Sequence, residues 1–417
     1  MKLFSTLLIC LLLYGTGRAQ SDSLKVKDRS RPSYRHMDRH TYLETQVDFQ
    51  ALSNQLSVVQ INDLLNDDFL DQAEKNELTN SINASLRYGY FREFSFTYRK
   101  PAVNIFDQTR PGQGFRLRNA YIQSALLDQQ TLDLIFYGNK PYEEQTLDLG
   151  PAGFETWYYT SLDYLFDVRL DTQQVAEISV GVVLGHDHNS YDLRGGSLYT
   201  ASEGEYLDAE LDYSLRDQVR ENLTLNGLGL SLGFQTELKV GDNKSLSLNI
   251  ADAGLIYWNR GRILDTDSSF RFTGATFENI LNITDSITDA LGEQYRRSFL
   301  YEEEGDYLSI MPFYLNAEFR IHRKKVLQDI RIGAEYRYLP GFLPRVYAGI
   351  GLLLSRSYLL NIEGSTGGYN PYRLDMGVKT RLGYNWELVA NIINLQQLIL
   401  INEPGGAGVT MRLRYRL

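Results

Sequence analysis

The sequence predicts an all-β protein, an antiparallel transmembrane β-barrel of about 14 strands, with about 12 or 16 as alternatives because single-chain bacterial barrels have even strand numbers. Three observations lead to this fold. Apolar and polar residues alternate with a period of two along most of the chain after residue 83. Many alternating segments are as long as the roughly 9–11 residues that a tilted strand needs to cross a bilayer. The chain also begins like an exported protein.

The period of two is clearest in residues 162–168, 176–184, 228–234, 313–321 and 409–417. Each segment places its apolar side chains on one face of a strand and its polar side chains on the other. Tyr, Phe or Trp residues stand near the ends of many segments, where membrane barrels carry two girdles of aromatic rings. A soluble β-sandwich is the alternative, but its strands would average about 5–6 residues and its rings would lie in mid-strand.

Length and composition restrict the other classes of protein. A chain of 417 residues has room for two or three soluble domains. Its mean hydropathy of −0.31, with no apolar run after the N-terminus as long as a transmembrane helix, excludes a helical membrane protein. A hydrophobic content of 43% is too high for a disordered chain. The net charge of −10 gives no support for nucleic-acid binding.

Residues 1–19 are predicted to be a signal peptide that is cleaved near Ala19. Lys2 supplies the positive start, Leu3 to Leu13 form a short apolar core, and small residues stand just before Gln20. The only cysteine, Cys10, lies inside the core, and Ile9 precedes it where a lipoprotein signal needs a small residue. We therefore expect a cysteine-free mature protein that is exported to the cell outer membrane.

Two regions interrupt the alternation. Residues 20–82 are predicted to be an N-terminal arm, basic at its start, followed by a helical plug or periplasmic segment, because apolar residues recur at helical spacing between Ile61 and Ile82. A helix packed on a soluble domain is the alternative. Residues 83–417 are then the barrel. Within it, residues 261–306 are predicted to be a long loop with an amphipathic helix, outside the cell or folded into the lumen.

The chain ends on an alternating segment, Met411 to Leu417. A terminal strand of this kind must pair with the first strand, because an open sheet edge is not tolerated in a bilayer. The segment also resembles the C-terminal signal that the barrel-assembly machinery reads, although that signal usually ends in an aromatic residue rather than Leu417. The predicted partners are therefore outer-membrane lipid and this machinery.

Several stretches resemble one family. They are Gly138-Asn139-Lys140-Pro141 followed by residues 145–149, then residues 248–258, and the Met311-Pro312 pair before the next strand. Together they are similar to a family of exported Bacteroidota proteins of unknown function, distantly allied to the long-chain fatty-acid transporter barrels. The resemblance implies a barrel of about 14 strands whose N-terminal segment can plug the lumen. It transfers no catalytic residue and no ligand pocket.

Charged residues on the polar faces of two consecutive strands are candidates for the lumen. They are Glu318, Arg320, Arg331, Glu335 and Arg337. If residues 323–326 form a tight turn, Arg320 faces Asp329 and Glu318 faces Arg331. Cross-strand ion pairs of this kind stabilise a polar lumen. We expect such a paired network, and the alternatives are a selectivity surface or a contact for the plug.

A positive stripe of Arg412, Arg414 and Arg416 lies on the last strand. It can attract an anionic solute, or it can pair with the plug or with an acidic segment that contains Asp208, Glu210 and Asp212. We expect pairing rather than solute binding.

The sequence contains no convincing catalytic or metal-binding motif. His186 and His188 stand two residues apart, but no third ligand accompanies them. Neither a nucleophile elbow, a zinc-protease motif nor a P-loop is present. No catalytic residue, cofactor or metal is therefore predicted.

The primary functional hypothesis is a barrel that passes or binds a small solute, hydrophobic ligands included. The first alternative is a non-transporting barrel subunit of an envelope secretion or assembly complex. The second alternative is a lipid-modifying enzyme that uses His186 or His188.

Overall fold

The computed structural model describes residues 41–65, 75–76, 85–100, 103–105, 108–110, 112–170, 174–218, 225–273, 303–323, 326–355 and 357–417. All of them belong to one compact unit, Arg35–Leu417, and a second unit, Met1–Tyr34, lies outside them, as does the predicted signal peptide. None of the helices in these residues is long and apolar enough to cross a membrane.

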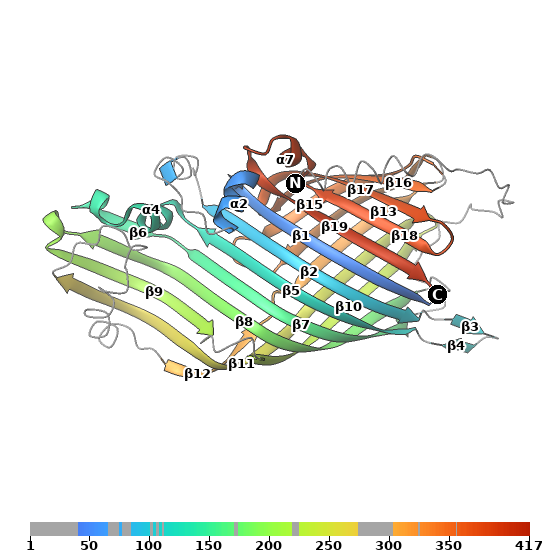
Figure 1. Cartoon of the computed structure of the whole chain (residues 1–417), viewed down its shortest axis with the longest axis horizontal. Coiled ribbons are helices and arrows are strands. Elements are labelled where there is room, and N and C mark those ends of the chain that lie inside the picture. Colours follow the sequence, from blue (N-terminus) through green and yellow to red (C-terminus); the bar gives the residue numbers. More distant parts are fainter. Residues whose placement is uncertain are drawn as a thin grey trace. The chain divides into compact units, whose positions relative to one another are not determined.

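Fourteen strands of the described chain close into one antiparallel ring (Figure 1). Each strand pairs with its successor around the ring, and the last pairs with the first. In ring order, the strands are β1 (Tyr42–Ser57), β2 (Leu86–Lys100), β5 (Gln113–Leu127), β7 (Ala152–Arg169), β8 (Val175–Thr200), β10 (Gly227–Gly241), β11 (Lys244–Thr273), β13 (Tyr314–His322), β14 (Leu327–Arg337), β15 (Leu343–Leu353), β16 (Tyr358–Gly368), β17 (Asn370–Leu382), β18 (Trp386–Ile393) and β19 (Pro404–Arg416). The predicted fold and strand number are confirmed.

The ring presents an apolar outer face. Leu230 on β10 is 65% exposed and Ile332 on β14 is 54% exposed, while their strand neighbours Ser231 and Arg331 point inward. The same alternation runs along most of the wall. Contact of such a surface with water is unfavourable, whereas hydrocarbon accommodates it, so this face is the lipid-facing side of a transmembrane barrel. Trp386 and Tyr415 pack together, 4.6 Å between ring centres, where an aromatic girdle is expected.

Strand β1 corrects the prediction that residues 20–82 precede the barrel. Tyr42 pairs with Arg416 of β19 and with Arg99 of β2, so the wall begins at residue 42 and not at 83. The alternation of Val47 and Phe49 with Gln46 and Asp48 is short, and its polar part obscured the strand. Helix α2 (Val58–Leu65) follows β1 directly and connects toward β2, so it is not an N-terminal plug; the rest of the predicted helix lies largely outside the described residues.

The connections differ in length at the two ends of the barrel. One end holds the C-terminus and short turns, such as that between β10 and β11; the hairpin of β3 (Val103–Ile105) and β4 (Gln108–Arg110) also lies in a connection of this end. The opposite end holds longer connections, among them α2, α4 (Gln129–Tyr137), a 3-10 helix (Lys140–Tyr142) and α7 (Leu395–Ile399). We call these the turn end and the loop end.

Two wall strands, β8 and β11, continue past the barrel wall at the loop end, and with two further strands they form what we call the projecting sheet. It consists of β6 (Thr146–Leu149), residues 189–200 of β8, β9 (Tyr206–Gln218) and residues 261–273 of β11. A short 3-10 turn (Ser202–Gly204) joins β8 to β9. One face of this sheet is apolar and packs with Leu134 of α4, burying Leu147, Leu149 and Leu193. The other face is polar.

The predicted bounds of the loop 261–306 are wrong at both ends. Residues up to Thr273 continue β11, and β12 (Glu303–Ile310) pairs with β11 before β13 begins. The predicted amphipathic helix falls on residues 274–302, outside the described part of the chain. Strands β12 and β13 both pair with β11 and together occupy the place of one strand in the wall. Residues 311–313 separate them, because Pro312 cannot donate a hydrogen bond to a neighbouring strand.

Candidate functional site

The turn between β14 and β15 folds into the lumen and reaches the far side of the ring. The Ser124 hydroxyl of β5 donates a hydrogen bond to the backbone carbonyl of Pro340, 2.5 Å away. The Tyr369 hydroxyl, from the junction of β16 and β17, lies 2.6 Å from the Ser124 oxygen and therefore serves as its donor. Ser124 has no exposed surface. Two inward turns thus meet one wall residue and close the lumen at this level.

Two glycines make room for this closure. A Cβ at Gly153 of β7 would lie 3.2 Å from Pro340 Cβ, and a Cβ at Gly89 of β2 would overlap the Tyr369 ring. Gly341 itself has φ +71°, which suits glycine at a tight turn. The wall is therefore shaped to receive the β14–β15 turn.

Apolar and aromatic side chains from around the ring fill the space beside the two turns. They belong to one buried cluster with Leu339 and Phe342 of the β14–β15 turn; its other members include Phe91, Ile122, Trp157, Tyr159, Trp258, Tyr307, Met311 and Tyr369. Phe342 packs edge-on against Tyr369, with 5.2 Å between ring centres. We call this layer the aromatic closure. Its members are nearly inaccessible to solvent, so the lumen is shut at this depth.

His188 is the polar exception inside the aromatic closure. Its ring lies 4.0 Å from Trp157 and stacks on Trp258, and its Nδ1 is 3.0 Å from the Tyr307 hydroxyl. Gln218 donates to that hydroxyl at 2.9 Å. His186 points elsewhere: its Nε2 is 2.9 Å from the Thr160 hydroxyl and its ring packs on Tyr158. The two imidazoles therefore do not converge, and among the described residues no cluster of three or more possible metal ligands is found.

Ion pairs line the lumen on the turn-end side of the aromatic closure. Arg118 of β5 binds both carboxylate oxygens of Asp252 on β11, although β7, β8 and β10 separate these strands in the ring. Arg345 of β15 lies 2.6 Å from carboxylates of both Glu335 and Glu363 and 3.4 Å from Asp375. Because Arg345 is only 4% exposed, these carboxylates compensate a charge that water does not reach.

The structure places the predicted lumen residues of β13 and β14 inside the barrel, but in a different register. Arg320 faces Arg331 and Glu318 faces Gly333, so the proposed Arg320–Asp329 and Glu318–Arg331 pairs are wrong. The turn is longer than the tight one assumed, which shifts the register by two residues. Glu318 pairs instead with Arg320 on its own strand, and Arg331 approaches Glu363 at 3.6 Å.

The remaining two residues of that set join other partners. Glu335 binds Arg345 and accepts a hydrogen bond from Tyr314 at 2.8 Å. Arg337 lies 4.8 Å from the ring centres of both Phe91 and Tyr314, a cation–π arrangement that links the ion pairs to the aromatic closure.

The arginine stripe of β19 is paired, but not with the predicted acids. Arg414 lies 2.7 Å from Glu44 of β1, and Arg412 lies 3.9 Å from the same carboxylate. Arg416 lies 3.9 Å from Glu387 of β18. The acidic residues Asp208, Glu210 and Asp212 are at the loop end, on the projecting sheet, far along the barrel from this stripe. Adjacent strands supply the partners because β1 and β18 flank β19.

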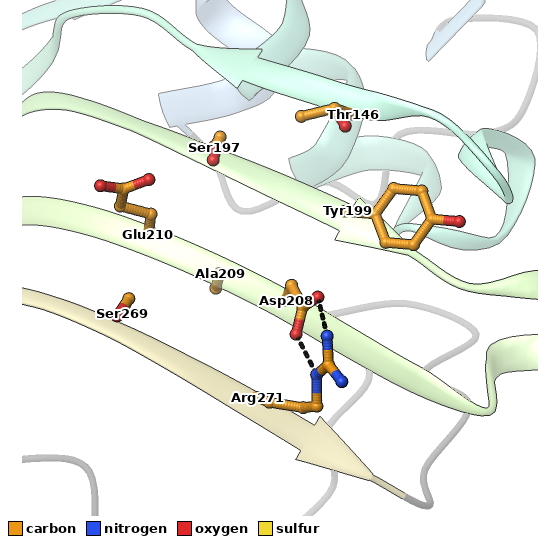
Figure 2. Close-up of a pocket in the computed structure, with 8 residues that line it drawn as sticks. All are labelled: Thr146, Ser197, Tyr199, Asp208, Ala209, Glu210, Ser269 and Arg271. Atoms are coloured by element: carbon orange, nitrogen blue, oxygen red, sulfur yellow. Dashed lines mark hydrogen bonds and ion pairs between the residues drawn. The ribbon is translucent and has the colours of Figure 1, made fainter.

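The polar face of the projecting sheet carries a shallow hollow of about 360 Å³ (Figure 2). The register of the strands determines which side chains line the hollow. One row across the four strands consists of Thr146, Tyr199, Asp208 and Arg271, and the next row contains Ser197, Glu210 and Ser269. The small side chains of Ser197 and Ser269 on both sides of Glu210 leave space above the sheet, and this space is the hollow. The Arg271 guanidinium donates two hydrogen bonds of 2.6 Å to Asp208 and lowers the pKa of that carboxyl below its ordinary value.

Sequence reasoning did not find the residues that close the lumen. Ser124, Gly153 and Tyr369 are single members of alternating strands or turns. Ser124 and Gly153 act through contacts with Pro340 across the ring, and Tyr369 acts through its hydrogen bond with Ser124. Pro340-Gly341 is a visible turn signal, but the direction of a turn depends on what it packs against. Glu363 and Asp375 were missed for the same reason, since each looks like any other lumen carboxylate.

These features define a transmembrane β-barrel with a closed lumen and a sheet that projects from one end. No protein-family model matches the chain, and no curated protein matches it. Solved structures with a similar course include a TodX deltaS2S3 mutant monoaromatic hydrocarbon channel, with 9% identity and a TM-score of 0.46 over 91% of this chain and 90% of that one.

A second similar structure is a FadL homologue of Pseudomonas aeruginosa, with 9% identity and a TM-score of 0.44 over 91% of each chain. A third is the translocator domain of the autotransporter NalP of Neisseria meningitidis. The latter has 9% identity and a TM-score of 0.32 over 92% of this chain and 90% of that one. The strand pairings themselves establish the fold.

Proposed function

We propose that the protein is an outer-membrane channel for small solutes that is held closed by its β14–β15 turn. The observation that carries this proposal is the hydrogen bond from Ser124 to Pro340 across the lumen. A turn that spans a barrel is a separate element from the wall, so it can leave without breaking a strand pairing. Since the closure consists largely of apolar and aromatic side chains, hydrophobic solutes are the ligands it favours.

The direction of the barrel follows from its connections. Outer-membrane barrels place short turns in the periplasm and longer loops outside the cell. The loop end, with the β14–β15 turn and the projecting sheet, is accordingly the extracellular end in this proposal. Strand β19 ends at the turn end, where the barrel-assembly machinery would read it from the periplasm.

A designed disulfide tests whether the turn is the gate. The double variant Gly153→Cys, Pro340→Cys introduces two cysteines that face each other. A Cβ built at Gly153 lies 3.2 Å from Pro340 Cβ, which is close to the Cβ separation in a disulfide. In planar bilayers, we expect rare openings for the reduced protein and none after oxidation. Removing the rings by Phe342→Ala with Tyr369→Ala should give frequent openings. The two single-cysteine variants, treated with the same oxidant, are the matched controls.

Two results would count against the gate. Equal conductance of the oxidised and reduced double-cysteine protein would show that solutes bypass the turn. A complete lack of conductance in the Phe342→Ala, Tyr369→Ala variant would remove the channel function. Ligand preference is measured separately by the fluorescence of Trp157 and Trp258 in a Trp386→Phe background, titrated with toluene and with a polar analogue, benzyl alcohol.

The projecting sheet favours a second candidate function, a non-transporting subunit of an envelope assembly. A channel does not require strands that continue past its wall, whereas a partner could use the added surface. Purification from native membranes distinguishes the two: a stoichiometric partner that is lost when residues 189–217 are replaced by a short hairpin supports the assembly role.

A further inference from the structure

The hollow on the projecting sheet lies outside the lumen, and its side chains match a ligand of a particular chemistry. Its lining offers the hydroxyls of Thr146, Ser197 and Ser269, the carboxylate of Glu210, and the Asp208–Arg271 pair (Figure 2). Hydroxyls both donate and accept, carboxylates accept, and guanidinium groups donate. The site therefore presents donors and acceptors side by side in one small area.

Side chains along the rim of the hollow contact one another. Arg271 is fixed by both hydrogen bonds to Asp208, and its guanidinium carbon lies 4.3 Å from the ring centre of Tyr206. Tyr206 in turn packs against Tyr199, with 6.0 Å between ring centres. Each contact restricts the next side chain, so little conformational entropy is lost when a ligand touches the rim.

Glu210 is the group left for a ligand. The two arginines beside it are already engaged, Arg271 by Asp208 and Arg194 by Asp212 and Asp265. Among the described residues, no ion pair or hydrogen bond is found for Glu210, and its side chain stands between two serines. An exposed carboxylate with small neighbours can accept hydrogen bonds from a ligand without first giving up a partner.

The charges select among ligand classes. Glu210 and Asp208 repel an anion, and a simple cation would use only the carboxylate of Glu210, because Asp208 already pairs with Arg271. A neutral molecule with many hydroxyl groups uses more of the lining, because it can donate to Glu210 while it accepts from Arg271. The exposed part of the Tyr199 ring offers an apolar surface for the C–H face of such a molecule.

We propose that this hollow is a binding site for a neutral saccharide. Its shallow, open form suits a sugar residue at the end or along the side of a chain rather than an enclosed metabolite. The hollow is at the lower end of the roughly 300–1,000 Å³ range of small-molecule sites, so one or two sugar units define its scale. The proposal goes beyond the channel function and does not depend on it, because no residue of the hollow belongs to the aromatic closure.

Saturation-transfer NMR on the full chain in nanodiscs tests the site. The probes are glucose, galactose, mannose and N-acetylglucosamine with their short oligomers, and glucosamine and glucuronic acid as charged analogues. We expect at least one neutral probe to bind. Glu210→Ala and Tyr199→Ala should each weaken that binding by about tenfold or more, and Ser269→Trp should abolish it by filling the hollow.

Matched controls separate the site from the fold. Glu205→Ala alters an exposed glutamate at the neighbouring β8–β9 turn and should leave binding unchanged. Heat-modifiable migration in gels reports that each variant retains its barrel. The proposal is overturned if no neutral probe binds more tightly than about 10 mM, if the charged analogues bind better than the neutral sugars, or if folded Glu210→Ala and Ser269→Trp proteins bind like the unmodified chain.

Discussion

Deletion of Tyr42–Ser57 is expected to abolish the folded barrel. Strand β1 pairs along its length with both β2 and β19, so its loss leaves two unpaired edges in the membrane. Each backbone group that hydrocarbon leaves without a hydrogen bond costs several kcal/mol, far more in total than the stability of about 5–15 kcal/mol that a protein domain has. Gels that compare heated and unheated samples, with circular dichroism in detergent, measure the result.

The matched control is deletion of residues 21–40, which removes a similar number of residues before the first strand. We expect that variant to migrate as a folded barrel, because the described pairings begin at Tyr42. A heat-modifiable, β-rich protein that lacks β1 would disprove the closure of the ring through this strand, and with it the assignment of the wall to residues 42–416.

Arg345→Met is expected to be the most destabilising single substitution in the lumen. Arg345 lies 2.6 Å from Glu335 and from Glu363, and its removal leaves Glu335, whose side chain is only 14% exposed, without its ion-pair partner. Breaking a buried ion pair on one side costs about 3–5 kcal/mol. Equilibrium unfolding in urea from lipid vesicles measures the change in the free energy of unfolding.

Arg194→Met is the control for Arg345→Met, because it removes an arginine that also pairs with more than one carboxylate but is 45% exposed in its side chain. Solvent screening makes that loss much smaller than the loss at Arg345. The double variant Arg345→Met with Glu335→Leu should recover part of the lost stability, since it removes the uncompensated carboxylate as well. A similar, small cost for both arginines would show that the lumen is hydrated around Arg345.

The sequence predicts the wall well because a membrane barrel imposes a local rule. Each strand must place apolar residues toward lipid and polar residues toward the lumen, so residues such as Leu230 and Ile332 reveal their orientation by alternation alone. The same rule predicts that Glu318, Arg331 and Arg414 lie on inner faces. It failed for β1, where polar residues interrupt the pattern, and for the extension of β11 past residue 261, which carries no lipid-facing stripe.

Pairing partners could not be predicted to the same degree. Register depends on turn length, and a turn between β13 and β14 longer than assumed moved Arg320 from Asp329 to Arg331. The arginine stripe of β19 pairs with Glu44 and Glu387, because ring closure places β1 and β18 beside β19. Alternation identifies the face on which a charge lies, but it contains no information on which opposite charge comes within a few ångströms.

The sequence by itself determined the class of this protein, a membrane-spanning antiparallel barrel, because strand periodicity and strand length are local properties that lipid constrains strictly. The strand pairings fixed the number of strands at fourteen. Only the tertiary structure decided that the lumen is closed and that a sheet of four strands projects from the barrel. Contacts such as Ser124 with Pro340, and Tyr199 with Asp208 and Arg271 across neighbouring strands, join residues far apart in the chain. They exist only once the ring has closed and its registers are fixed.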